Sequence, residues 1–277
     1  MLMIHRYAAS ATGLLANAYL IETADGVVAV DAPLLLADGA AYRARLDALG
    51  VPLAGVLLTH PHPDHYNTVT QLTAGLDVPI IATVDADRVM REHDDAKRAQ
   101  WRDMFGDQWP DTSTFANRTV VDGESLSLAG LSFTARDLGR GECAAQTVWL
   151  VNDGDDGAFI GDMVFHGMHA YLGEGALDQW IEMLVGAEDL LGHVPVLYPG
   201  HGAPSGRAML GEQRRYLLTI REALRRLSDA DGRLTEASTS ELNALMDTYL
   251  PGAPLLWLIE AGAGEAAAGL RAHALDG

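Results

Sequence analysis

The sequence contains one cysteine and only half as many basic as acidic residues. Because Cys143 stands alone, the chain can form neither an internal disulfide nor a cysteine-rich zinc knuckle. Lysine and arginine number 19 against 38 aspartates and glutamates, which gives a formal net charge of −19. A surface this acidic repels phosphate backbones and anionic lipid headgroups. We therefore expect a small-molecule substrate, and neither nucleic acid nor a membrane as a partner.

Long apolar runs are also missing. No stretch of about 18 uninterrupted apolar residues occurs, so the sequence predicts no membrane-spanning helix. The opening residues, MLMIHRYAASATG, are broken by His5, Arg6 and Ser10 and lack the apolar core of a secretory signal, which makes the cytoplasm the expected location. Since 48% of the 277 residues are apolar and no linker or repeat interrupts them, we expect one domain over residues 1–277, as a monomer or homodimer.

Short β-branched runs alternate with helical patterns, which predicts an α/β fold. The predicted strands are Asn17–Glu22, Val27–Asp31, Gly55–Thr59, Ile80–Thr83, Leu131–Arg136, Thr147–Val151, Ala158–Gly161 and Pro195–Tyr198. Apolar periodicity predicts helices over about Gly39–Leu49, Asp64–Ala74, Ala86–Phe105, Ala176–Leu191 and Met209–Leu227. The C-terminal tail from about residue 208 is predicted to be helical, with two further helices after Ser238 separated by a break at Pro251–Pro254.

The least regular stretch is Gly106–Asn117, which mixes aromatic and polar residues. Two interpretations of it stay open: a flap over a pocket, or a loop that packs against the core. The same two interpretations, a pocket wall or ordinary core, apply to the aromatic residues Trp101, Phe105, Trp109 and Phe115.

The strongest chemical signal is the segment Thr59-His60-Pro61-His62-Pro63-Asp64-His65, directly after the apolar run Val56-Leu57-Leu58. It places four potential metal ligands at the end of a predicted buried strand and the start of a helix. Imidazole suits zinc, iron and similar metals, and aspartate adds an anionic oxygen. The two prolines stiffen the turn and hold the ligands in place before a metal arrives. The segment therefore predicts a metal site.

The pattern His60-x-His62-x-Asp64-His65 resembles the HxHxDH signature of the metallo-β-lactamase superfamily. The resemblance covers most of the chain. Asn17–Ile21 through Asp31 is similar to the opening strands of the family, Gly161-Asp162 to the position of its bridging aspartate, and Tyr198-Pro199-Gly200-His201-Gly202 to its last ligand motif. This resemblance implies an αββα four-layer sandwich, with the metal site at one edge between two sheets.

The resemblance also implies two divalent metal ions, with zinc as the first expectation and manganese or iron as alternatives. One ion would use His60 and His62. The other would use Asp64, His65 and His201, and Asp162 would bridge the two ions.

The sequence departs from the family at one ligand. The family supplies a third histidine to the first metal from a Gly-His-Thr/Ser element, whereas the corresponding segment here is Gly139-Arg140-Gly141-Glu142-Cys143. A carboxylate oxygen binds zinc and also suits harder metals, so our hypothesis is that Glu142 completes the first site. The alternative is that Glu142 points elsewhere and the centre holds a single metal. We expect Cys143 to be a small packing residue beside it.

Three more residues, His166, His169 and Tyr171, follow the predicted bridging aspartate closely in the sequence. We expect them to line the pocket and bind substrate. An ordinary loop position near the site is an equally open interpretation for each of them.

The implied chemistry is hydrolysis. Two divalent ions lower the pKa of a water held between them from about 15.7 towards 7, which makes a hydroxide nucleophile at neutral pH. Asp162 and Asp64 are the expected catalytic residues that fix its direction. We expect a metal-dependent hydrolase of a small carbonyl ester, lactone, thioester or lactam. The alternatives are a mononuclear iron oxidoreductase of the same fold, similar to persulfide dioxygenases, and a non-catalytic metal-binding protein.

Overall fold

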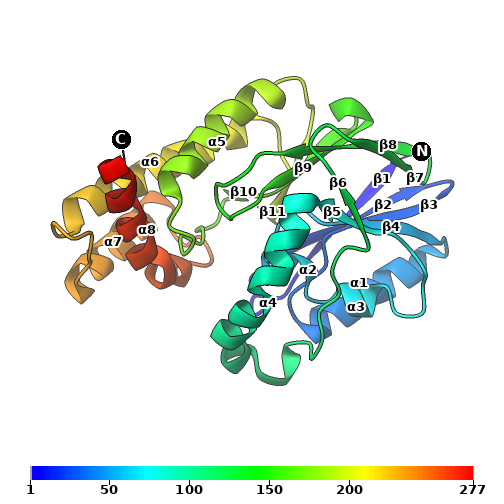
Figure 1. Ribbon diagram of the computed structural model, residues 1–277, viewed down its shortest axis with the longest axis horizontal. Helices are drawn as coiled ribbons and strands as arrows, with labels where there is room; N and C mark the ends of the chain where they lie inside the picture. Colours follow the sequence, from blue (N-terminus) through cyan, green and yellow to red (C-terminus); the bar gives the residue numbers. More distant parts are fainter. Residues whose placement is uncertain (1, 277) are drawn as a thin grey trace.

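Two β-sheets lie between layers of helices in the computed structural model, which describes residues 2–276 and the side chains of residues 2–272 (Figure 1). Within this part of the chain the first sheet has six strands, in the order β1-β2-β3-β4-β5-β6. The first three strands pair antiparallel, and β3 to β6 run parallel. Their bounds are β1 (Met3–Ala8), β2 (Asn17–Thr23), β3 (Gly26–Val30), β4 (Leu53–Leu57), β5 (Ile80–Thr83) and β6 (Arg118–Val120).

The second sheet has five strands in the described residues, in the order β11-β10-β9-β8-β7. Its neighbours pair antiparallel except β10 and β11, which run parallel. The bounds are β7 (Ser125–Leu128), β8 (Leu131–Asp137), β9 (Thr147–Val151), β10 (Gly157–His166) and β11 (Leu197–Gly202).

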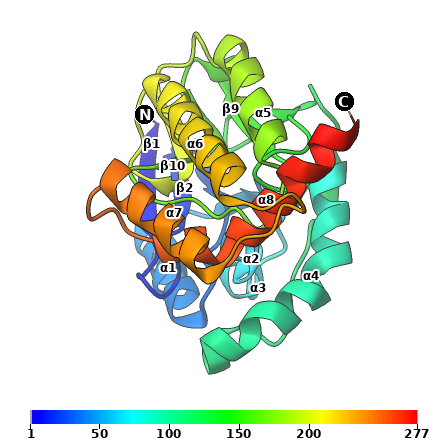
Figure 2. The ribbon, with the colours of Figure 1, turned by 90° about the vertical axis from the view of Figure 1, so that its left-hand side faces the viewer.

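Helices cover the outer face of each sheet (Figures 1 and 2). Those of the N-terminal half are α1 (Leu36–Leu49), α2 (Pro63–Tyr66), α3 (Val69–Leu72) and α4 (Val84–Phe105), followed by the short 3-10 turn η1 (Gly106–Gln108). Those of the C-terminal half are α5 (Leu177–Leu190), α6 (Ala208–Leu227), α7 (Glu236–Tyr249) and α8 (Trp257–Asp276). A second 3-10 turn, η2 (Asn152–Gly154), joins β9 to β10 in the second sheet. None of the helices in the described part of the chain combines the length and apolar composition needed to cross a bilayer.

The apolar core explains why the layers stack in this order. Tyr42 of α1 and Met90 of α4 pack on the outer face of the first sheet. Val28 of β3 and Trp149 of β9 belong to a cluster that fills the space between the sheets. A third cluster, which includes Leu217 of α6, joins α5–α8 to the second sheet. The central strands β3 and β9 are buried along their whole length, as expected of strands covered on both faces. The predicted αββα sandwich is confirmed.

Three short strands, β1, β6 and β7, were not predicted. Their side chains are largely exposed or half-buried, so the alternating pattern that identifies a strand is weak. Each lies at the edge of a sheet and is defined by hydrogen bonds to one neighbouring strand. Such strands depend on the neighbour more than on their own sequence.

The helix predicted over Asp64–Ala74 is wrong, because the chain forms two short helices, α2 and α3, in its place. Thr68 Oγ1 donates to the carbonyl of Pro33 at 2.6 Å, and Asn67 Nδ2 donates to the carbonyl of Leu34 at 3.2 Å. Side chains of this kind offer the backbone an alternative to helical hydrogen bonding. They tie the ligand-bearing turn to the segment that follows β3.

Candidate metal centre

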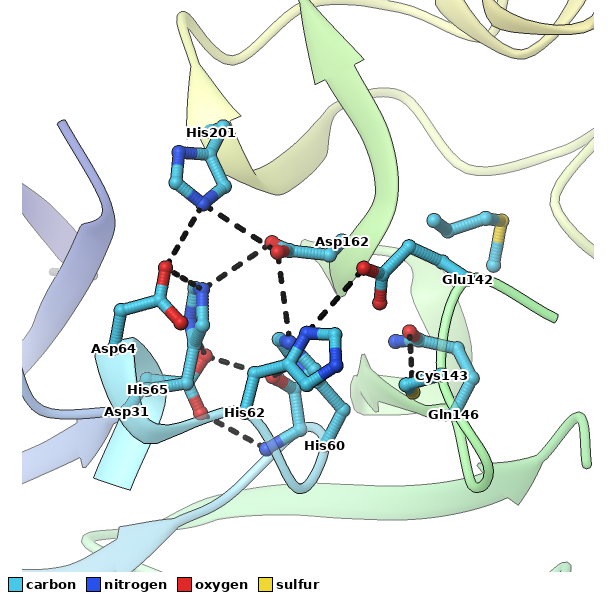
Figure 3. Close-up of polar contacts among 12 residues, drawn as sticks. Asp31, His60, His62, Asp64, His65, Glu142, Cys143, Gln146, Asp162 and His201 are labelled. Atoms are coloured by element: carbon cyan, nitrogen blue, oxygen red, sulfur yellow. Dashed lines mark hydrogen bonds and ion pairs between the residues drawn. The ribbon is translucent and has the colours of Figure 1, made fainter. Parts of the chain in front are cut away.

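The predicted ligands point toward one another from segments of both sheets and the loops that follow their strands (Figure 3). His60 and His62 lie in the loop after β4, and Asp64 and His65 lie in α2. Glu142 comes from the loop between β8 and β9, whereas Asp162 and His201 lie within β10 and β11. The carboxyl ends of neighbouring parallel strands share one edge of a sheet, which is where α/β proteins commonly bind ligands.

The first ligand group contains His60, His62, Glu142 and Asp162. One ligand atom from each of these four residues lies within 4.8 Å of all the others. Nδ1 of His62 is 3.3 Å from Oε1 of Glu142, and Nε2 of His60 is 3.5 Å from Oδ2 of Asp162. Glu142 therefore faces the cluster, in the position that the sequence hypothesis requires.

The second ligand group contains Asp64, His65, Asp162 and His201, with ligand atoms under the same 4.8 Å limit. Nε2 of His201 lies 3.3 Å from Oδ2 of Asp64 and 3.4 Å from Oδ2 of Asp162. Nε2 of His65 lies 3.2 Å from Oδ1 of Asp162. Asp162 thus belongs to both groups and stands between them.

The spacing and the lack of partners both fit metal ligands. Two donors bound about 2.0–2.1 Å from a tetrahedral ion lie roughly 3.3 Å apart, close to the distances in both groups. All seven residues are buried. Nε2 of His60, His65 and His201 and both carboxylate oxygens of Glu142 make no hydrogen bond in the described structure. Because buried polar atoms are normally hydrogen-bonded, atoms that face one another without forming such bonds fit a divalent cation held between them.

Glycine makes room for Asp162. Gly161 adopts a φ of +49°, and the pairing of β10 with β11 shifts register on either side of it. A β-carbon at Gly200 would overlap Oδ1 of Asp162. The aspartate reaches the centre through a bulged strand and a gap that only glycine leaves open.

Asp31 holds two of the candidate ligands from outside. Its Oδ2 accepts a hydrogen bond from Thr59 Oγ1 at 2.7 Å and contacts Nδ1 of His65 at 3.0 Å. Thr59 Oγ1 in turn contacts Nδ1 of His60 at 2.9 Å. These contacts use the outer nitrogen of each ring and leave Nε2 facing the cluster. A carboxylate in this position orients a ligating histidine and raises its basicity.

A different pair of residues holds His62. Its Nε2 lies 3.2 Å from Oε1 of Glu174, and the same oxygen accepts a hydrogen bond from Lys97 Nζ at 2.7 Å. Lys97 belongs to α4, whereas Glu174 precedes α5. The outer side of His62 is therefore fixed by a contact that joins the two halves of the chain.

His201 is held by packing and by its strand. The ring of Phe165 stacks on the His201 ring, with centroids 4.5 Å apart and planes 9° apart. The carbonyl of Pro199 accepts hydrogen bonds from Tyr19 Oη at 2.6 Å and Asn17 Nδ2 at 2.9 Å. β11 is thereby fixed to β2 of the first sheet.

The charges of the centre are strongly coupled. Burial opposes protonation of His201, but neighbouring Asp162 raises the pKa of His201 to about 9. Burial likewise opposes ionisation of Asp162, yet His201 and His65 hold the pKa of Asp162 well below its usual value. Burial, followed by the charge of Asp162, raises the pKa of Glu142 well above its usual value. Without a cation, protons would have to balance the carboxylates, so metal binding would release protons.

The sequence profile of the metallo-beta-lactamase superfamily matches residues 11–201. The chain belongs to this superfamily. No curated protein sequence matches it.

Solved structures of metallo-β-lactamase proteins share the fold. A beta-lactamase domain protein from Burkholderia ambifaria superposes with a TM-score of 0.72 at 18% identity, covering 100% of this chain and 87% of the other. A metallo-beta-lactamase family protein from Thermus thermophilus gives a TM-score of 0.68 at 22% identity, covering 99% and 93%. The metallo-beta-lactamase FIM-1 from Pseudomonas aeruginosa gives a TM-score of 0.57 at 16% identity, and the superposition covers 79% of this chain and 90% of the other.

Two of the three expected substrate-binding residues lie away from this metallo-β-lactamase centre. The ring of His166 contacts the carbonyl of Ala203 through Nδ1 at 2.6 Å. His169 is buried, and its Nδ1 lies 3.2 Å from the hydroxyl of Tyr216. The strand β10 ends at His166, His169 follows it, and neither residue lines the cavity beside the centre. Tyr171 does lie beside the centre, with its ring centroid 6.1 Å from that of His62.

Sequence reasoning missed the residues that hold the ligands from outside. Asp31 was noted only as the end of a strand, although its position opposite Thr59 follows from the parallel pairing of β3 with β4. Lys97 and Glu174 gave no signal, since they are far apart in the sequence and belong to no motif. Cys143 is buried and its Sγ contacts the carbonyl of Ala145 at 3.3 Å, as a packing residue does.

Proposed function

We propose that this protein is a dinuclear metallo-hydrolase that cleaves a small carbonyl ester, lactone, thioester or lactam. The observation that carries the proposal is the position of Asp162, which is shared by two groups of buried ligand atoms. When bound, two divalent cations lower the pKa of a water between them and polarise the substrate carbonyl.

Two carboxylates have proposed catalytic roles. Asp162 would be shared by the two ion positions, because it belongs to both ligand groups and Gly200 leaves room for its carboxylate. Asp64, whose Oδ2 lies 3.3 Å from Nε2 of His201, is at the edge of the centre and lines the adjoining cavity. There it can accept a hydrogen bond from the attacking water and fix its direction.

We propose that Glu142 completes the first ion position and that zinc occupies the centre, with manganese or iron as alternatives. The orphaned, buried carboxylate of Glu142 beside His62 supports the first part. The structure of FIM-1, which is described as a mono-zinc form, supports zinc by analogy of fold. A carboxylate in place of an imidazole adds negative charge and favours harder ions.

Metal analysis combined with hydrolysis assays tests this proposal. We expect about two divalent ions per chain, activity lost on chelation, and activity restored by one metal. The matched control is His193→Ala, which removes an exposed histidine whose ring contacts the carbonyl of Asp153 and should leave metal content unchanged. A pure protein that binds metal but hydrolyses no ester, lactone, thioester or lactam would contradict the proposal.

One observation favours a second candidate. The first ligand group offers two imidazoles together with the carboxylates of Glu142 and Asp162, and two imidazoles with one carboxylate are the donor set of non-haem iron oxygenases. A mononuclear iron oxidoreductase would bind about one iron and consume O₂ with its substrate. Iron content together with O₂ uptake separates it from the hydrolase.

A further inference from the structure

A cavity with about 530 Å³ of space free of atoms, part of it open to solvent, adjoins the metal centre. Asp64, Asp162 and His201 line one end. Away from them the lining is almost entirely apolar. We call the following residues the apolar wall: Leu34, Trp101, Phe105, Trp109, Trp257 and Leu258.

The apolar wall is assembled from distant parts of the chain. Trp101 and Phe105 lie on the last turns of α4, Trp109 follows η1, and Trp257 opens α8. Residues of α8 lie outside the matched range 11–201, so this part of the wall is not contributed by the region shared with the superfamily profile. A substrate that fills the cavity would meet both the metal centre and α8.

The wall is held firmly on its α4 side. Trp109 is 2% exposed and packs with Leu34 and Leu35. Arg98 of α4 donates to the carbonyl of Pro110 at 2.7 Å, and Arg102 pairs with Asp111 at 2.7 Å. The stretch after η1 is therefore fixed to α4, which favours the packed-loop interpretation of Gly106–Asn117.

Away from the proposed metal ions, the side chains that line the cavity offer no free positive charge for an anionic substituent. Among its lining residues, all of which are described, Lys97 is the one lysine or arginine. Its Nζ is already paired with Glu174 at 2.7 Å, and its side chain is 13% exposed. A carboxylate that entered the wall would be desolvated without a cation to pair with it, which costs considerable free energy.

One polar atom of the wall is without a partner. The indole N–H of Trp109 is buried and makes no hydrogen bond in the described structure. A buried donor of this kind is normally satisfied by some acceptor. Because this atom is inaccessible to solvent, a substituent lying along the wall would contact the apolar part of the indole ring.

We propose that the cavity selects uncharged esters or lactones that carry an extended alkyl or aryl substituent, with the substituent lying along the apolar wall. This inference rests on the proposed hydrolase function. Burying one methylene group is worth about a fourfold gain in binding. We therefore expect kcat/KM to rise by about that factor for each added methylene until the wall is filled.

The kinetic test uses the metal-loaded enzyme with two matched series of substrates. One series is alkyl-substituted lactones and p-nitrophenyl esters of increasing chain length. The other has the same lengths but ends in a carboxylate. We expect kcat/KM to rise steeply with chain length in the neutral series. Each carboxylate counterpart should have a lower kcat/KM than the neutral substrate of the same length. A flat profile, or equal rates for both series, would overturn the inference.

A matched pair of aromatic variants locates the effect. Trp257 and Tyr249 are both 39% exposed, but only Trp257 lines this cavity. Trp257→Ala should make the chain-length dependence shallower, whereas Tyr249→Ala should leave it unchanged. If kcat/KM depended on chain length equally in both variants, the substituent would lie somewhere other than the proposed wall.

A binding readout separates this inference from the proposed function. Three of the five tryptophans, Trp101, Trp109 and Trp257, line the cavity, so ligand binding should alter intrinsic fluorescence. We expect octanamide to change the fluorescence saturably and octanoate to do so far more weakly. Binding of octanamide without hydrolysis of any substrate would refute the hydrolase but not the selectivity of the cavity. Hydrolysis without this preference would refute the selectivity alone.

Discussion

The two ligand groups of the centre share Asp162 but are held in different ways. In the second group, His65 lies on α2 and His201 on a strand of the second sheet, and Asp31 fixes the outer nitrogen of His65. In the first group, Glu142 comes from a loop, and His62 depends on Glu174 for its outer contact. Donors fixed by regular structure need less ordering when they bind a metal.

This contrast suggests where the superfamily pattern tolerates change. The departure from the pattern, Glu142, lies in the ligand group that uses more loop residues. We expect the second position to bind its ion more tightly than the first. Variants that remove one support at a time test that difference.

The largest effect is expected from Asp162→Ala, because this residue belongs to both groups. Metal content should fall from about two ions per chain to below about one, and hydrolysis should be lost. Metal analysis and assays at matched protein concentration measure both. Circular dichroism checks that the variant is folded, and retention of both ions would contradict a bridging role.

Glu142→Ala should remove the metal ion of the first position and leave that of the second. We expect about one ion to be released while the second position stays filled. Glu142→His, which restores the imidazole of the superfamily pattern, should recover the ion and shift preference from manganese towards zinc. Competition between the two metals, read by mass spectrometry of the native protein, measures this. Unchanged metal content in Glu142→Ala would mean that Glu142 is not a ligand.

Asp31→Asn should weaken the second position more than the first, because Asp31 contacts His65 directly and reaches His60 only through Thr59. The change keeps the size of the side chain but removes the negative charge beside Nδ1 of His65. Loss of such an outer contact typically costs about 10- to 100-fold in metal affinity. Titration with a competing chelator gives the two affinities separately. A uniform loss at both positions would show that Asp31 acts on the whole centre.

Glu174→Gln is the counterpart for the first position, with a smaller expected effect, near the lower end of the roughly 10- to 100-fold range. Glu174 is 19% exposed at its side chain, so solvent can replace part of its contact with His62. The same chelator titration should show weakening at the first position only. Glu212→Gln, an exposed acidic change elsewhere, serves as control.

Local sequence patterns predicted most of the buried strands and the ligand motif, whereas the order of the layers followed from the resemblance to the superfamily. Buried strands such as β3 and β9 carry continuous apolar runs, and the spacing of His60 and His65 identifies a family. The edge strand β1 has no such pattern, and its pairing with β2 is a tertiary property. The break in the predicted helix at Thr68 depends on a carbonyl at Pro33, which the local sequence does not reveal.

The positions of the candidate site were predicted where a motif carried them. Glu142 could be placed by its distance from the next strand, and it does face His62. Glu174 and Lys97 meet only because α4 and the segment before α5 come together in the folded chain. His166 and His169 follow Asp162 closely in the sequence but contact Ala203 and Tyr216 and do not line the cavity beside the centre, because nearness along the chain does not fix where a side chain lies.

The ligands come from segments on both sides of the sandwich, beginning at His60 and ending at His201. During synthesis, no complete ion-binding pocket can exist until the chain has been made as far as residue 201 and its two halves have docked. Metal loading would therefore be a late event in the maturation of this protein. The amount of metal that a preparation retains would then report on how many of its molecules have assembled correctly.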